Sequence, residues 1–137
     1  MPVHYRISPK LNLVVFVHKG AVTGNDLLFA ISASFDDPLR VPGMLNILDM
    51  FDVQDELEMK DLWDVLELEK KVRQRKEAVK VAVLSWSDGV KILASAMTLM
   101  SGGTIEAEVF NTVHDASAWL GIVDEMELQK FLNESQS

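Results

Sequence analysis

The sequence contains no cysteine among its 137 residues, which excludes disulfide bonds and thiol chemistry. It also lacks the Gly-x-Gly-x-x-Gly dinucleotide motif, the phosphate-binding loop and the Gly-x-Ser-x-Gly nucleophile motif. The acidic stretch from Asp49 to Glu69 has neither the Asp-x-Asp-x-Asp-Gly spacing of a calcium loop nor a histidine, and is typical of a solvated helix face. We therefore expect neither a cofactor nor a metal.

Histidine is scarce, with only His4, His18 and His114 in the chain. A hairpin near the start of the chain would bring His4 close to His18. No acidic or thiol ligand accompanies this pair in the sequence, so a catalytic or metal-binding role for it is disfavoured.

Basic residues are outnumbered, with 13 Lys and Arg against 21 Asp and Glu, which gives a net charge of −8. A field of this sign repels phosphate backbones and anionic lipid surfaces. We expect no nucleic acid as a partner.

Long apolar runs are absent from the first part of the chain, where the longest, Leu13 to Val17, is far too short to span a membrane. The first seven residues also lack the basic region and apolar run of a signal peptide. The expectation is a cytoplasmic protein without membrane insertion.

The composition, 48% hydrophobic and 25% charged, is that of a globular protein large enough for one core. We predict a single domain over residues 1–132 and a disordered polar tail over 133–137.

Alternating strand and helix patterns predict an α/β fold: a mixed sheet of about five strands with helices packed against it, in the order ββαβαβαβα. Strands are expected at 3–8, 11–18, 44–50, 79–84 and 104–110, with helices at 24–35, 55–76, 87–101 and 112–120. A last short helix over 124–132 is a possible addition to this order. Thr23 with Asp26, and Thr112 with Asp115, have the spacing of helix capping boxes. The helix at 55–76 would place Met59, Leu62, Leu66 and Val72 in the core.

Polar and aromatic side chains follow two of the predicted parallel strands, where ligands of open α/β sheets bind. The candidate ligand-binding residues are Asp49, Phe51, Asp52, Ser85, Trp86, Ser87 and Asp88. If the two strands are neighbours, these side chains share one rim suited to a small polar ligand. The alternative is structural, with Ser87 or Asp88 capping the next helix while Asp49 and Asp52 end a strand.

The helix at 87–101 has more apolar residues than one buried face requires. Val90, Leu93, Ala94 and Met97 form one stripe. The candidate oligomer interface is formed by Ile92, Ala96, Leu99 and Met100. A homo-oligomer, most simply a dimer, is the favoured explanation, with packing inside the chain or an apolar ligand as alternatives.

Several segments of the chain resemble the SpoIIAA-like branch of the STAS superfamily, small bacterial proteins grouped with Sec14-type lipid-binding folds. The resemblance is carried by His4–Ile7, Leu45–Asp49, Ala78–Leu84, Val109–Phe110 and Asp115–Gly121. It implies a sheet covered by helices and no established enzymatic activity.

Anti-sigma factor antagonists of that superfamily carry a phosphorylatable Ser or Thr after the central strand. The matching place here is Asp49–Val53, and no Ser or Thr occurs between Ser34 and Ser85. A serine phosphoswitch at that turn is therefore not expected.

The leading hypothesis is a non-enzymatic, self-associating module that binds a protein or a small ligand. The first alternative is a carrier of a lipid-like or other apolar ligand, with Trp86, Phe51 and the methionines of the helix at 87–101 lining the pocket. A weaker alternative is a hydrolase that uses Asp49, Asp52 or Asp88 as an acid or base.

Overall fold

The computed structural model describes residues 3–53, 60–61, 63–65, 67 and 79–136. In the range 55–76, where a helix was predicted, the described residues are helical. All four core residues predicted there lie outside the described residues, namely Met59, Leu62, Leu66 and Val72.

The sheet begins with an antiparallel hairpin and continues with parallel strands. Strands β1 (Val3–Ser8) and β2 (Leu13–Gly20) form the hairpin, and β3 (Leu45–Val53), β4 (Val79–Leu84) and β5 (Ile105–Phe110) follow in parallel. The order across the sheet is β1-β2-β3-β4-β5, so neighbours in space are also successive strands in the chain. This confirms the predicted mixed, five-stranded α/β architecture.

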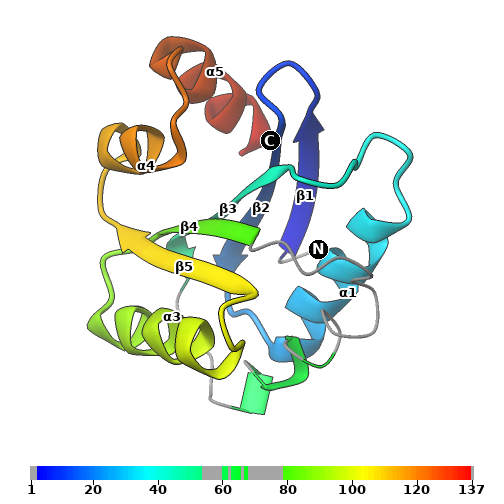
Figure 1. Cartoon of the computed structure of the whole chain (residues 1–137), viewed down its shortest axis with the longest axis vertical. Coiled ribbons are helices and arrows are strands. Elements are labelled where there is room, and N and C mark those ends of the chain that lie inside the picture. Colours follow the sequence, from blue (N-terminus) through cyan, green and yellow to red (C-terminus); the bar gives the residue numbers. More distant parts are fainter. Residues whose placement is uncertain (1–2, 54–59, 62, 66, 68–78, 137) are drawn as a thin grey trace.

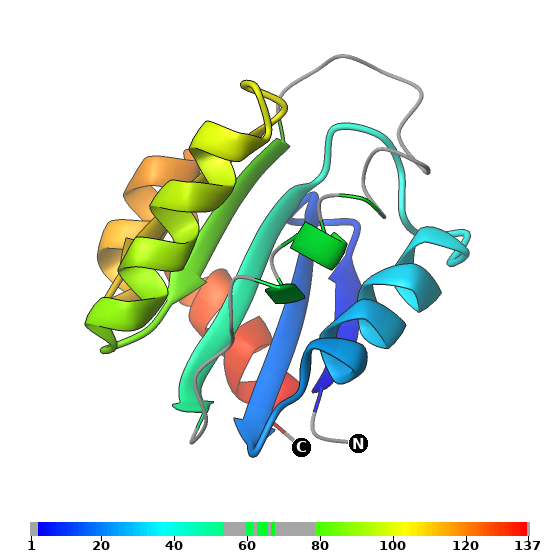
Figure 2. The same ribbon diagram turned by 90° about the horizontal axis from the view of Figure 1, so that it is seen from below.

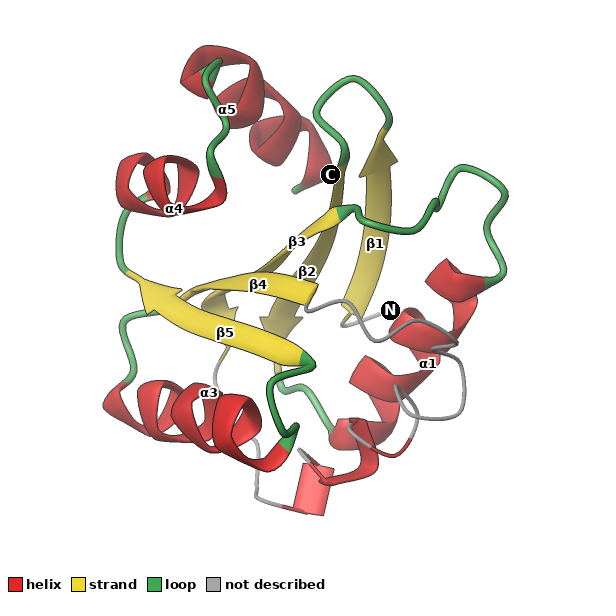
Figure 3. Cartoon of the chain, viewed as in Figure 1, coloured by secondary structure: helices red, strands yellow, loops and turns green. Residues whose placement is uncertain are grey.

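Helices cover both faces of the sheet, giving three layers (Figures 1 and 3). Helices α1 (Gly24–Phe35) and α3 (Asp88–Met100) lie on one face, below the strands in Figure 1. Helices α4 (Val113–Leu120) and α5 (Glu125–Ser135) lie on the other. Figure 2 shows α1 and α3 side by side across the sheet, with β2 to β4 passing behind the space between them.

Each face of the sheet has its own apolar core because side chains alternate along a strand. In β2, Val15 and Val17 pack toward α4 and α5, whereas Val14 and Phe16 pack toward α1. The edge strand β5 leaves Glu106 and Glu108 exposed, and these residues alternate with the apolar residues of the strand.

The predicted helix caps are present in the structure. Thr23 and Asp26 form a complete capping box at the start of α1. The side chain of Thr112 accepts a hydrogen bond from the backbone of Asp115 at the start of α4. Gly121 ends α4 with a φ of 76°, which is a conformation that favours glycine.

The predicted boundary of the C-terminal tail is wrong, because α5 continues to Ser135 instead of ending near 132. Ser135 is fully buried and its carbonyl oxygen accepts a hydrogen bond from His4 Nε2 at 2.7 Å. The polar composition of residues 133–135 concealed this contact with β1.

Candidate functional site

The two strands of the predicted ligand-binding rim are neighbours, because β3 pairs with β4 in parallel and Asp49 lies opposite Leu84. At their carboxyl ends the rings of Phe51 and Trp86 lie 5.4 Å apart between centroids. Trp86 is 68% exposed. The structure therefore brings the aromatic members of the rim together at the surface.

The serines of the rim have structural partners. Ser85 is buried and its hydroxyl accepts a hydrogen bond from the Ser87 backbone at 3.1 Å. The hydroxyl of Ser87 accepts one from the Val90 backbone at 3.3 Å and so caps α3. Asp88 is exposed in the first turn of that helix. Ser87 therefore has the structural role of the alternative interpretation, in which it caps the helix that follows.

Asp49 is covered by the end of the chain. It is buried, and its Oδ2 accepts a hydrogen bond from Gln136 Nε2 at 2.9 Å. The pKa of this carboxyl is raised, mainly by burial, whereas its hydrogen bonds and Lys19 act in the opposite direction. Lys19 in turn donates to the Gln136 carbonyl oxygen. Asp52, three residues farther along β3, is exposed.

His18 is a buried histidine whose environment the sequence did not reveal. It lies at an irregularity in the pairing of β2 with β3, between Val17 and Lys19. Its Nδ1 donates to the Asp49 carbonyl oxygen at 3.2 Å, which leaves Nε2 as a buried acceptor without a partner among the described residues. Burial lowers the pKa of His18 from 6.5 to about 4, so the ring is neutral near pH 7.

His4 and His18 do not form a joint site. In the hairpin His18 is the partner of Val3, and His4 is the partner of Val17. Because neighbouring residues of a strand point to opposite faces, the two rings lie on opposite sides of the sheet. Within the described ranges, no group of three or more His, Asp or Glu is placed to hold a metal ion.

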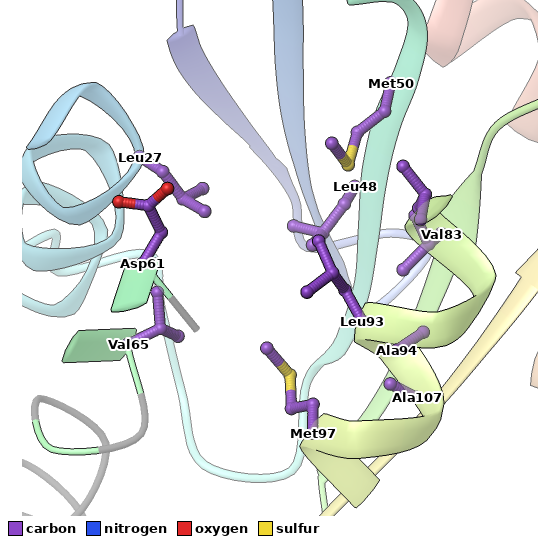
Figure 4. Close-up of a pocket in the computed structure, with 11 residues that line it drawn as sticks. Leu27, Leu48, Met50, Asp61, Val65, Val83, Leu93, Ala94, Met97 and Ala107 are labelled. Carbon is purple, nitrogen blue, oxygen red and sulfur yellow. The ribbon is translucent and has the colours of Figure 1, made fainter. Parts of the chain in front are cut away.

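A cleft opens on the opposite face of the sheet from Asp49, between α1 and α3 (Figure 4). It encloses about 510 Å³ of space not filled by atoms, part of it open to solvent. The described lining residues come from both helices, from three strands and from two residues that follow β3 in the chain, Asp61 and Val65. They are Leu27, Leu48, Met50, Asp61, Val65, Val83, Val90, Leu93, Ala94, Met97 and Ala107.

One wall of the cleft is the predicted apolar stripe of α3. Leu93, Ala94 and Met97 face Leu27 and Val65 across the opening in Figure 4. The other wall and the floor were not predicted as a site.

The aromatic residues expected to line an apolar pocket lie elsewhere. Phe51 packs against the core under α4 and α5, and Trp86 stacks on it. Met97 does line the cleft, and so does Met50 of β3. The other methionine of α3, Met100, is exposed.

Among the described lining residues, Asp61 is the one with an ionisable side chain. Its side chain lies directly against Gly24 at the start of α1, where a Cβ atom added to the glycine would stand 1.9 Å from Oδ1. A side chain at position 24 would therefore displace the carboxylate.

The outer side of α3 carries the candidate oligomer interface. Leu99 and Ile92 are 81% and 68% exposed, and Met100 is also exposed. Ala96 differs from them because it is half-buried against the cluster around Ile105 of β5.

No protein-family model and no curated protein matches the chain. A solved structure from Shewanella loihica PV-4 is similar to it and is described as an uncharacterized protein from the DUF3478 family with a SpoIIAA-like fold. The two chains share 21% sequence identity over 86% of this chain and 91% of the other, with a TM-score of 0.57. The likeness confirms the SpoIIAA-like fold, and at this identity it concerns the fold alone.

None of the helices among the described residues is both long and apolar enough to cross a lipid bilayer.

Proposed function

We propose that this protein is a non-enzymatic module that binds a small apolar ligand in the cleft between α1 and α3. The observation that carries the proposal is the cleft itself, whose described lining consists of aliphatic side chains and methionines apart from Asp61. Ligand pockets in proteins are mostly apolar.

The methionines of the cleft suit a ligand-binding role. Met50 and Met97 approach the opening from β3 and from α3 (Figure 4). Methionine is unbranched and polarizable, so it adapts to apolar groups of different shapes. A ligand that fills the cleft would bury the half-buried Met97 further and gain affinity from the apolar area removed from water.

We also propose that the protein is not an enzyme and that Asp49–Val53 does not serve as a phosphorylation site. Asp49, the most buried carboxylate of the rim, is engaged by Gln136 and by the Phe51 backbone. Ser87 is engaged as a helix cap. These contacts give the two groups structural roles and support a binding function over a hydrolytic one.

The test is a titration of the protein with octan-1-ol, followed by the carbon-13 methyl resonances of its methionines. We expect Met50 and Met97 to shift in a saturable way, because both line the cleft. Met126 is the internal control, since it is 84% exposed on α5, on the other face of the sheet. The proposal fails if octan-1-ol does not shift the resonances of Met50 and Met97. It also fails if the resonance of Met126 shifts by the same amount as theirs.

A matched pair of variants locates the binding. Ala94 is buried and lines the cleft, whereas the neighbouring Ser95 is exposed on the same helix. Ala94→Phe fills the cleft and should abolish the octan-1-ol shifts, and Ser95→Phe should leave them unchanged. If both variants bind octan-1-ol as the natural chain does, the cleft is not the site.

Self-association through the outer side of α3 is a second candidate function. It is favoured by the exposure of Ile92, Leu99 and Met100 on one helix, since soluble monomers rarely expose contiguous apolar patches of large size. Leu99→Glu should convert a dimer into a monomer in native mass spectrometry. A natural chain that is already monomeric, or an unchanged mass in the variant, would remove this candidate.

A further inference from the structure

Strand β5 lies at one edge of the sheet and pairs with β4 along its inner side. On that side the carbonyl oxygen of Thr104 accepts a hydrogen bond from the backbone N–H of Val79. The backbone groups of successive residues point to opposite sides of a strand. Ile105 and Ala107 therefore direct their N–H and C=O groups away from β4, along the edge of the sheet.

Two hydroxyl groups of α3 bind these edge groups. The Ala107 N–H donates to Thr98 Oγ1 at 3.0 Å, and the same hydroxyl lies 3.3 Å from the Ala107 carbonyl oxygen. The Ile105 N–H donates to Ser101 Oγ at 3.0 Å, and the Ser101 hydroxyl donates to the Ile105 carbonyl oxygen at 3.1 Å. Each hydroxyl thus takes the place that the backbone of a further strand would occupy.

The packing of α3 on β5 keeps the two hydroxyls in position. Helix and strand share a cluster of apolar side chains: Leu93, Ala96, Met97, Ile105 and Ala107. Ser101 is buried and Thr98 is half-buried. A backbone group that loses its hydrogen bond in such surroundings costs more than one that can turn to water. The bonds therefore hold the helix to the edge of the sheet.

The acidic residues of β5 act against pairing at the same edge. Glu106 and Glu108 are exposed and alternate with the residues that pack on α3. In an antiparallel pairing of two copies centred on Ala107, Glu106 would lie opposite the partner's Glu108. Like charges directly opposite each other destabilise a pair of strands. A covering helix and charged side chains are both known protections of an edge strand.

We propose that Thr98 and Ser101 close the β5 edge against strand addition by a second copy of this chain, with Glu106 and Glu108 opposing the same pairing. This role concerns assembly and does not depend on ligand binding in the cleft. Copies that associate at this side of the molecule then do so through the outer surface of α3, where Leu99 is exposed, and not by extending the sheet.

The first test follows hydrogen exchange of the two edge amides, those of Ile105 and Ala107. Thr98→Val removes the hydroxyl and keeps the shape of the side chain. We expect the Ala107 amide to exchange about tenfold faster in this variant and the Ile105 amide to be unchanged. Ser101→Ala should have the reverse effect. Thr98→Ser keeps the hydroxyl and should leave both amides protected. An Ala107 amide that exchanges equally in Thr98→Val and in the natural chain overturns the assignment.

The second test measures assembly by sedimentation over a range of protein concentrations. The double variant Thr98→Val/Ser101→Ala should form larger assemblies than the natural chain, in which the edge amides become protected again. Adding Glu108→Lys should strengthen the association, because the lysine would lie opposite the partner's Glu106. Glu108→Lys alone is the matched control and should sediment as the natural chain does, since the hydroxyls still occupy the edge. If the double variant does not fold, Thr98→Val/Glu108→Lys takes its place.

Three results would overturn the proposal. One is sedimentation of the hydroxyl-free variants that matches the natural chain at every concentration, with or without Glu108→Lys. Another is association of Glu108→Lys alone, because the two hydroxyls then do not close the edge. The third is a larger assembly whose edge amides stay unprotected, because its contacts then lie elsewhere on the molecule.

Discussion

Replacing the buried His18 should change how the stability of the protein depends on pH. The ring is 1% exposed, and burial lowers its pKa from 6.5 to about 4. A histidine with a lowered pKa in the folded state binds fewer protons there than in the unfolded chain. Its contribution to stability is therefore fully present above about pH 6.5 and is lost as the pH falls toward 4.

The magnitude follows from the pKa difference. Each pKa unit corresponds to about 1.4 kcal/mol, so the native state loses about 3 kcal/mol relative to the unfolded chain across this window. Asp49 acts in the opposite direction, because its raised pKa makes the native state bind more protons than the unfolded chain as the pH falls. That contribution is present with or without the histidine ring.

The assay is urea unfolding of the natural chain and of His18→Phe between about pH 7.5 and about pH 4.5. Phenylalanine fills a similar space and does not titrate, although it leaves the Asp49 carbonyl oxygen without the donor it has at 3.2 Å. The variant should start less stable near neutral pH and lose less stability on acidification. Two curves that stay parallel over the whole range would refute the assigned environment of His18.

Three further stability changes follow from the structure, each measured by urea unfolding at neutral pH. Leu128→Ala should cost about 2–5 kcal/mol, because Leu128 is completely buried between α5 and the sheet; a cost below about 1 kcal/mol would contradict that packing. Gln136→Ala should cost about 1–3 kcal/mol, because it leaves the buried Asp49 carboxyl without its amide donor; an unchanged midpoint would show that the contact is not formed in solution. Gly24→Ala should cost about 1–3 kcal/mol by displacing Asp61, whereas a neutral or stabilising effect would contradict the close approach of the two residues.

The parts of the fold that depend on local sequence were predictable. The capping spacings of Thr23 and Thr112 placed the starts of α1 and α4. Each of these signals acts within one helical turn. The alternation of apolar and acidic residues in β5 is likewise a local signal, typical of a strand with one exposed face at the edge of a sheet.

The candidate sites were only partly predictable because they depend on contacts between distant segments. The sequence placed the rim residues at the ends of two strands, and these strands are neighbours in the structure. It did not indicate that Gln136 covers Asp49, because the two residues are 87 positions apart in the chain. The apolar stripe of α3 was identified, yet the opposite wall of the cleft comes from Leu27 and Asp61. Nothing in the sequence around either residue indicates that the two lie together on one face of the sheet, opposite α3.

His18 shows a different limit of the sequence. It follows the apolar run of β2, where a polar residue near the end of a strand usually faces water. Here the pairing with β3 is irregular at this point, and the His18 side chain is buried. The carbonyl oxygen of Asp49 is its hydrogen-bond partner. An irregularity of this kind has no signature in the residues themselves.

The central claim, that an apolar ligand binds between α1 and α3, is tested most directly by intermolecular nuclear Overhauser effects. The measurement uses octan-1-ol and protein with labelled methionine methyl groups. We expect cross-peaks from the alkyl chain to Met50 and Met97, which line the cleft from β3 and from α3. Cross-peaks confined to the exposed Met100 and Met126, or none at all, would contradict the account.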